Sequence, residues 1–295
     1  MIAPIEEIFC EIDDFCKAFY PEFERNLLPA GGSVRQRSGT MCASEIITIL
    51  VLFHLSHYRD LKNFYLADVM RSHRSEFPNL LSYHRFVEVE GRVLVALCVF
   101  LKQKTGDQTG FYFIDSTPLA VCHNKRIHKH KTFADIAKRG HTSMGWFYGF
   151  KLHVVINDKG QIMAFCLTPG NVHDLTPAPD LLAGLHGMAA GDKGYLSKKL
   201  AAEMKDNGLK MLTKVRKNMK QPVLEPIEKL WLSKRGLVET VIEQFKQVCQ
   251  IQHTRHRSVV NFMINALAAL AAYTLKSTKP SITINAFENT RLIPN

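Results

Sequence analysis

Short apolar runs separated by turn residues define the middle of the chain. Residues 111–115 (FYFID) are aromatic and apolar between two polar segments, which predicts a buried strand that stops on Asp115. Residues 151–157 and 161–168 flank a DKG turn and predict a hairpin. The pattern further predicts helices at 175–185, where Asp174 is a candidate cap, and 197–207, and strands at 187–190 and 209–215, which together give the order β-β-β-α-β-α-β.

Helical periodicity dominates both ends of the chain. Residues 1–105 are expected to be mostly helical, and residues 259–275 are uncharged and predict a buried helix that is marginal in length for a membrane span. Between them, residues 235–249 place apolar positions at helical spacing. That apolar stripe consists of Val238, Val241, Ile242, Phe245, Val248 and Cys249.

Three acids follow elements of this pattern. Asp115 ends the first strand, and Asp192 follows the strand at 187–190. At the carboxyl ends of strands in open α/β sheets, loops converge over one crevice. Glu239 shares a helix face with Arg235, Glu243 and Lys246, which also fits a solvated face with intrahelical ion pairs. Two sheet-end carboxylates nonetheless indicate a site for a hard cation.

Taken together, Asp115, Asp192 and Glu239 resemble the catalytic triad of the DDE transposases. The second Asp is followed by x-Gly-Tyr, and Arg235, Glu239 and Lys246 fit the pattern Arg, three residues, Glu, six residues, Lys. The family often has Tyr three positions before that Arg, whereas this chain has Leu232. Residues 169–175 (PGNVHDL) also look like this group, and residues 13–24 and 82–86 look like the insertion-sequence 982 group of bacteria.

The resemblance implies a ribonuclease H-like mixed α/β sheet flanked by helices, and DNA transposition as the activity. It implies metal-dependent cleavage at element ends and strand transfer into target DNA, with Mg²⁺ or Mn²⁺ as the cofactor. Two hard ions suit phosphoryl transfer with oxygen ligands. Asp115 would bridge both ions and Asp192 and Glu239 would each hold one, while Arg235 and Lys246 would contact phosphates. Glu243 is an alternative to Glu239 because it lies one turn further on the same helix face.

Charge supports a polyanionic partner. The formal net charge is +11, and because residues 1–30 carry −5, the remainder carries +16. Residues 122–151 contain basic side chains interleaved with Phe133, Trp146, Phe147 and Tyr148, a composition that suits phosphate neutralisation and base stacking but also a flexible solvated loop. The candidate DNA-binding residues are Arg235, Lys246, Lys125, Arg126, Lys129, Lys131, Lys214, Arg216 and Lys217.

Other interpretations remain open from the sequence. Cys122, His123, His128 and His130 could form a zinc site, although their spacing fits no standard zinc pattern. The basic interval that holds Arg71, His73, Arg74, His84 and Arg85 could belong to a DNA-binding helix-turn-helix, or the helices could simply cover the catalytic core. His173 and Asp174 could lie near the active site, because their loop leaves the same sheet.

These features define the expected organisation and function. We expect a helical region at 1–105 that is a candidate for binding element ends, a catalytic domain at 106–280 and a tail at 281–295. The expected partner is double-stranded DNA, with a homo-oligomer on paired ends, and neither a membrane nor a small-molecule substrate. Seven scattered cysteines without a CxxC pair, and the absence of a secretory signal, favour a cytoplasmic protein. The resemblance further implies a bacterial protein that associates with the nucleoid. A structure-specific nuclease of similar fold and a non-catalytic DNA-binding protein are the alternatives.

Overall fold

The computed structural model describes residues 4–27, 39–215, 218–219, 223–252 and 256–282. The chain forms two compact units, each assembled from separate stretches of sequence. One unit comprises Met1–Lys104, Arg126–Ala134 and Gln244–Ser277, and the other comprises Thr105–Lys125, Asp135–Glu243 and Thr278–Asn295.

The first unit is built from helices. α11 (Val259–Thr274) forms its centre, with eleven buried residues, as the uncharged stretch at 259–275 predicts. No helix in the described part of the chain is long and apolar enough to cross a membrane. The other helices of this unit are α1 (Ile5–Leu27), α2 (Ala43–Leu55), α3 (Leu61–Phe64), η1 (Tyr65–Val69), α4 (Met70–Ser72), α5 (Tyr83–Val89), η2 (Glu90–Val93) and α6 (Leu94–Gln103).

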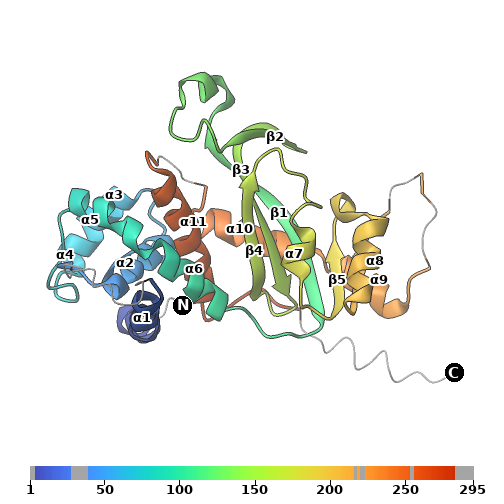
Figure 1. The fold of residues 1–295 in the computed structure, drawn as a ribbon, viewed down its shortest axis with the longest axis horizontal. Coiled ribbons are helices and arrows are strands. Elements are labelled where there is room, and N and C mark those ends of the chain that lie inside the picture. The colour runs from blue at the N-terminus through green and yellow to red at the C-terminus, as the bar shows by residue number, and fades with distance from the viewer. Residues whose placement is uncertain (1–3, 28–38, 216–217, 220–222, 253–255, 283–295) are drawn as a thin grey trace. The chain divides into compact units, whose positions relative to one another are not determined.

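The second unit is built on one mixed six-stranded sheet (Figure 1). Its strands lie in the order β2-β3-β1-β5-β6, and β4 pairs with the edge of β3. β1 runs antiparallel to β3 and parallel to β5, and β5 runs parallel to β6. The strands are β1 (Phe111–Cys122), β2 (Lys138–Thr142), β3 (Gly145–Asn157), β4 (Ile162–Pro169), β5 (Gly187–Gly191) and β6 (Leu209–Thr213).

Alternate residues of β1 are covered by different helices, because successive side chains of a strand point to opposite faces. Tyr112 and Ile114 belong to the apolar cluster that includes residues of α7 (Ala178–Leu182) and α8 (Lys198–Asp206). Phe111 and Phe113 pack instead on Trp231 of α9 (Pro226–Ser233), with ring centroids 4.4 Å and 5.0 Å away; the Phe113 ring is stacked and the Phe111 ring is tilted. Figure 1 shows α7 in front of the strands and α10 (Gly236–Gln247) behind them. The mixed α/β sheet flanked by helices therefore matches the expected fold class at that level.

The structure corrects three local predictions. β1 does not stop on Asp115 but continues to Cys122, because pairing with β3 continues through Asp115↔Val154 to Cys122↔Tyr148. The basic stretch is not a solvated loop throughout, since it contains the short helix η3 (Asn124–Lys129), β2 and the first half of β3.

The third correction concerns the helix expected at 175–185, of which only α7 forms. Pro177 is its N-cap residue, and Asp174 therefore does not cap it. Proline restricts the residue before it and lacks an N–H, so the helix cannot begin earlier in TPAP. Gly184, at a φ of 74°, follows its end.

Candidate active site

Asp115 and Asp192 lie at equivalent positions on neighbouring parallel strands. β1 and β5 pair in register up to Phe113↔Ala190, and each Asp lies two residues further along. The Asp115 Oδ1 accepts the Ser116 N–H at 2.8 Å, and the Asp192 Oδ1 accepts the Gly194 N–H at 2.7 Å. The sheet therefore places both carboxylates at the same level, just past the last β1–β5 pair.

The Asp-x-Gly-Tyr motif has a structural explanation. Asp192 is the N-cap of the short helix η4 (Lys193–Tyr195), and a side chain at Gly194 would meet the Asp192 Oδ1 at 2.8 Å. The Tyr195 ring packs so closely over Gly191 that a Cβ there would come within 2.9 Å of it. Both glycines thus let the turn after β5 close tightly and fix the Asp192 carboxylate.

Arg235 connects the third acid to the first. Its guanidinium donates to the Glu239 carboxylate one turn along α10, and its Nη1 lies 3.8 Å from the Asp115 Oδ2. Arg235 and Asp115 are each about one-fifth exposed, whereas the Glu239 side chain is half-exposed. The structure therefore brings Asp115, Arg235 and Glu239 into one polar cluster, in which the contact between Arg235 and Glu239 is the one that the shared helix face predicts.

The environment of Asp115 disfavours its charged form. The pKa of its carboxyl is raised from 3.8 to about 6, chiefly by burial, and the charges of the neighbouring Asp192 and Glu239 carboxylates contribute to this rise. The Ser116 N–H and the Arg235 guanidinium oppose this rise. A cation beside these carboxylates would relieve their unfavourable interaction.

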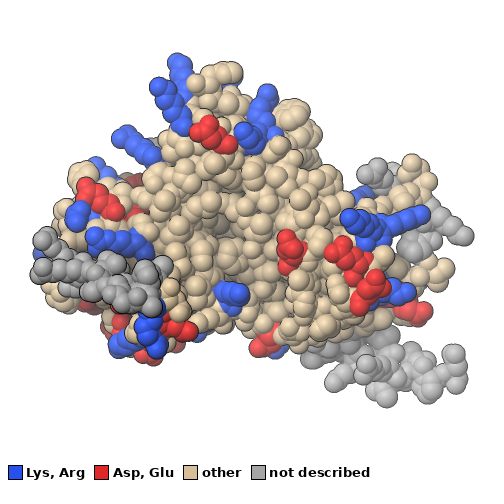
Figure 2. All heavy atoms as spheres, viewed as in Figure 1, with Lys and Arg blue, Asp and Glu red and all other residues tan. Residues whose placement is uncertain are grey.

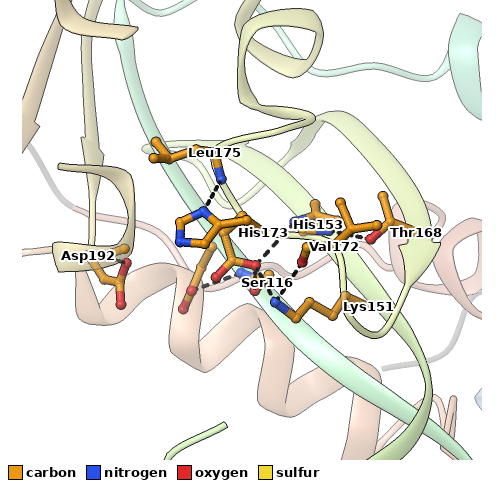
Figure 3. A network of polar contacts seen from close by, with 11 residues as sticks. Ser116, Lys151, His153, Thr168, Val172, His173, Leu175 and Asp192 are labelled. Carbon is orange, nitrogen blue, oxygen red and sulfur yellow. Dashed lines mark hydrogen bonds and ion pairs between the residues drawn. The ribbon is translucent and has the colours of Figure 1, made fainter. Parts of the chain in front are cut away.

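A fourth carboxylate, Asp174, lies beside this cluster. Its Oδ1 accepts the Ser116 hydroxyl and the Lys151 ammonium, both at 3.0 Å, and Lys151 also donates to the Val172 carbonyl at 3.0 Å. The Lys151 side chain is only 12% exposed, so Asp174 neutralises a largely buried cation. Figure 3 shows this network with Asp192 beside it, and the Cβ position of Gly194 lies 3.7 Å from the Asp174 Oδ2.

His153 completes the network as a neutral group. Burial lowers the pKa of its imidazole to about 4, and its Nε2 pairs with the Thr168 hydroxyl at 2.9 Å. Its Nδ1 lies 3.8 Å from Asp174, too far for a hydrogen bond. Lys151 is therefore the cation that balances Asp174. The sequence offered His-Asp in PGNVHDL as a signal for this carboxylate but gave none for Ser116, Lys151 or His153.

No group of three or more His, Cys, Asp or Glu side chains in the described ranges is arranged to hold a metal ion. Cys122 and His123 belong to the unit with the sheet, whereas His128 and His130 belong to the helical unit. A zinc site built from these four residues therefore stays a prediction.

Asp115, Asp192 and Glu239 do not converge to ligating distances in this structure. Their chemistry nonetheless fits a hard cation, because all are oxygen donors and a positive charge, Arg235, already contacts two of them.

The basic candidates come from both units of the chain. Lys125 belongs to the unit with the sheet, whereas Arg126, Lys129 and Lys131 belong to the helical unit, and all four are exposed. Lys214 is exposed after β6, and Lys246 is half-buried on α10. Figure 2 shows Lys and Arg side chains on the face drawn, several of them near acidic residues. Arg216 and Lys217 lie outside the described residues.

The aromatic residues of the basic stretch differ from the expectation of base stacking. Phe133, Phe147 and Tyr148 are between 1% and 8% exposed and serve as core residues, whereas Trp146 is 58% exposed. An aromatic ring in the core has no face left for a nucleic-acid base. Of these four aromatic residues, only Trp146 fits a contact with DNA.

Comparison with known proteins gives one family match. A family model described as "Transposase DDE domain" matches residues 105–259, more than half of the chain, and this span includes Asp115, Asp192 and Glu239. No curated protein matches the chain. A solved structure, a piggyBac transposase synaptic complex with hairpin DNA, is 12% identical over 91% of this chain and 72% of its own, with a TM-score of 0.48. That likeness is too weak to support an argument about fold or function.

Proposed function

Because the chain belongs to the family with a transposase DDE domain, we propose that it cuts DNA at the ends of an insertion sequence and joins those ends to target DNA. Asp115, Asp192 and Glu239 are the proposed catalytic acids. The observation that carries this proposal is geometric: Arg235 contacts both Asp115 and Glu239, and Asp192 follows β5 at the same level at which Asp115 lies on the neighbouring β1.

Each acid has a proposed role in holding divalent ions. Asp115, on the central strand, would hold two Mg²⁺ or Mn²⁺ ions together with Asp192 and Glu239. When bound, the ions would supply the charge stabilisation that in-line phosphoryl transfer requires. The Glu239 side chain, which is half-exposed at the start of a helix, has the freedom to turn toward Asp115.

Arg235 has two proposed roles in turn. In the protein without metal it neutralises Asp115 and Glu239, which otherwise repel one another. With metal and DNA present, its guanidinium is released to bind a phosphate, for which its planar donor geometry is suited. Lys246, two turns further along α10 than Glu239, is proposed to contact the same strand.

The wider assignments also remain proposals. The sheet order and the mixture of parallel and antiparallel pairing support a ribonuclease H-like core within the proposed catalytic domain, residues 106–280, of which residues 126–134 and 244–277 pack with the helical unit. We assign DNA-end binding to residues 1–105, a tail to residues 281–295, and membership of the bacterial insertion-sequence 982 group to the whole chain. A homo-oligomer would pair two element ends. The remaining basic candidates would neutralise phosphates; these candidates are Lys125, Arg126, Lys129, Lys131, Lys214, Arg216 and Lys217.

The test uses purified protein, Mn²⁺ and a supercoiled plasmid that carries this gene with its flanking DNA. Wild type should nick and then cut the plasmid at the element ends, and Asp115→Asn and Glu239→Gln should lose cleavage while retaining DNA binding. Glu243→Gln is the matched control, because Glu243 is an exposed acid one turn along the same helix. Cleavage by Asp115→Asn at the wild-type rate would remove Asp115 from the mechanism.

A second readout separates transposition from simple cutting. Pre-cleaved ends that carry a free 3′-hydroxyl are incubated with a circular target plasmid, and covalently joined products are counted. Joining by wild type supports the transposase. Cutting without joining would establish the structure-specific nuclease instead, and binding without either would leave a non-catalytic DNA-binding protein.

A further inference from the structure

The turn between β2 and β3 presents two large apolar side chains to solvent. Met144 is 95% exposed and Trp146 is 58% exposed, although both lie in a paired hairpin of the unit that holds the catalytic acids. Burying apolar side chains of this size lowers the free energy, and side chains that stay exposed to water do not contribute this stabilisation. Their joint exposure on one short turn therefore suggests a contact that covers them.

The exposure of these side chains is built into the hairpin. Strand pairing continues to Thr142↔Gly145, so only Ser143 and Met144 form the loop. The Thr142 hydroxyl donates to the Gly145 carbonyl at 3.3 Å and accepts the Met144 N–H at 3.2 Å. Gly145 adopts a φ of 110°, which favours glycine. This short, internally bonded turn holds Met144 at the tip.

The surroundings of Trp146 are cationic. The Arg139 guanidinium lies 5.1 Å from the centre of the Trp146 ring, and the His141 ring meets it edge-on at 5.1 Å. Lys138 is also exposed on β2, and residues 138–146 (KRGHTSMGW) contain no acid. The Asn124 side chain donates to the Trp146 carbonyl at 2.7 Å and ties this part of β3 to the neighbouring segment. An apolar tip with a basic flank complements bases and phosphates together.

We propose that this hairpin is a DNA wedge that recognises a distorted duplex. Met144 enters between base pairs at a disrupted step, Trp146 stacks on the base that becomes unpaired, and Lys138 and Arg139 neutralise the adjacent phosphates. Apolar wedges and aromatic platforms act in these ways in other nucleic-acid-binding proteins. The proposal rests on the proposed function, since it assigns the hairpin to the same DNA that the active site cuts.

The experiment compares two probes of the same sequence. One is a fully paired duplex, and the other contains a single unpaired 2-aminopurine, whose fluorescence reports loss of stacking. Trp146→Ala and Met144→Ala should each weaken binding to the unpaired probe on the order of tenfold, the scale of one base–aromatic stack. Binding to the fully paired probe should change by less than about twofold, because the phosphate contacts persist.

Intrinsic fluorescence provides an independent readout. The chain contains only two tryptophans, and Trp231 is fully buried, so the acrylamide-accessible emission comes from Trp146. The unpaired probe should quench that emission and protect it from acrylamide. Trp146→Phe should lose the signal but retain part of the binding preference, because Phe also stacks.

Val223→Ala is the matched control, since Val223 is 98% exposed in the same unit and lies on no strand. It should bind both probes as wild type does. Equal binding of the two probes by wild type, or equal loss on both probes in Trp146→Ala, would overturn the wedge. Plasmid cleavage measured with the same preparations separates the two claims: cleavage without a preference for the unpaired probe refutes only the wedge, whereas wild type that neither binds nor cuts DNA refutes the proposed function.

Discussion

Replacing Asp115 by Asn is predicted to stabilise the protein in the absence of metal, even though it abolishes cleavage. Burial raises the pKa of the Asp115 carboxyl to about 6, whereas the unfolded chain ionises at its ordinary value of 3.8. The folded protein therefore holds this proton more tightly than the unfolded chain does. The contribution of this group to the free energy of unfolding is therefore largest below pH 3.8, decreases between pH 3.8 and about 6, and stays low above that range.

The magnitude follows from the same two values. A separation of about 2 pH units corresponds to about 3 kcal/mol at 1.36 kcal/mol per unit. Asn retains the shape of the side chain and an oxygen for the Ser116 N–H. We therefore expect Asp115→Asn to raise the free energy of unfolding at pH 8 by as much as about 3 kcal/mol, and to change it little at pH 4.

Urea denaturation in EDTA measures this difference. The emission of Trp231 reports the unit that contains Asp115, because Trp231 packs on β1 beside that residue, and a Trp146→Phe background removes the other tryptophan. Asp206→Asn, at an exposed position on α8 of the same unit, is the control and should change stability by less than about 0.5 kcal/mol. This prediction would be refuted if Asp115→Asn did not raise the free energy of unfolding at pH 8, or if it raised that free energy by the same amount at pH 4 as at pH 8.

Two further predictions concern the charges around this carboxyl. Arg235→Gln removes a cation 3.8 Å from Asp115, an attraction worth about 1 kcal/mol in water and about 4 kcal/mol at a dielectric constant near 20. The pKa of Asp115 should rise by about 1 to 3 units, so the midpoint of Mn²⁺ binding, followed by electron paramagnetic resonance, should move to higher pH by that amount. Asp174→Asn leaves Lys151 largely buried without a counterion and should destabilise the protein by about 1–3 kcal/mol in urea denaturation. Adding Lys151→Met should restore part of that loss, and strictly additive effects would show that the two residues are not coupled.

The sequence carried the parts of the fold that depend on local pattern. The alternation of residues 151–157 and 161–168 around a turn predicted the β3–β4 hairpin, and the uncharged stretch at 259–275 predicted α11. The match of Arg235 and Glu239 to one helix face predicted their contact. Each of these signals lies within a single element, where side-chain spacing alone sets the geometry.

Features that depend on tertiary pairing were not predictable in this way. Lys138–Thr142 is basic and contains glycine, so nothing local marks it as a strand; it becomes one because β3 offers a partner edge. Similarly, the polar Ser116 after Asp115 predicts the end of a strand, whereas β1 continues to Cys122 because it pairs with β3. The local sequence makes Asp174 a candidate N-cap of the helix that follows it. In the structure its carboxylate instead accepts a hydrogen bond from Lys151, 23 residues earlier in the chain.

The central claim, that Asp115, Asp192 and Glu239 hold the catalytic ions, is tested most directly by a crystal of the protein with its cleaved DNA, soaked in Mn²⁺. We predict anomalous peaks about 2.1 Å from oxygens of all three carboxylates, with Arg235 displaced from Asp115. Peaks bound to other residues, such as Glu243 in place of Glu239, or no peak near Asp115, would contradict the account.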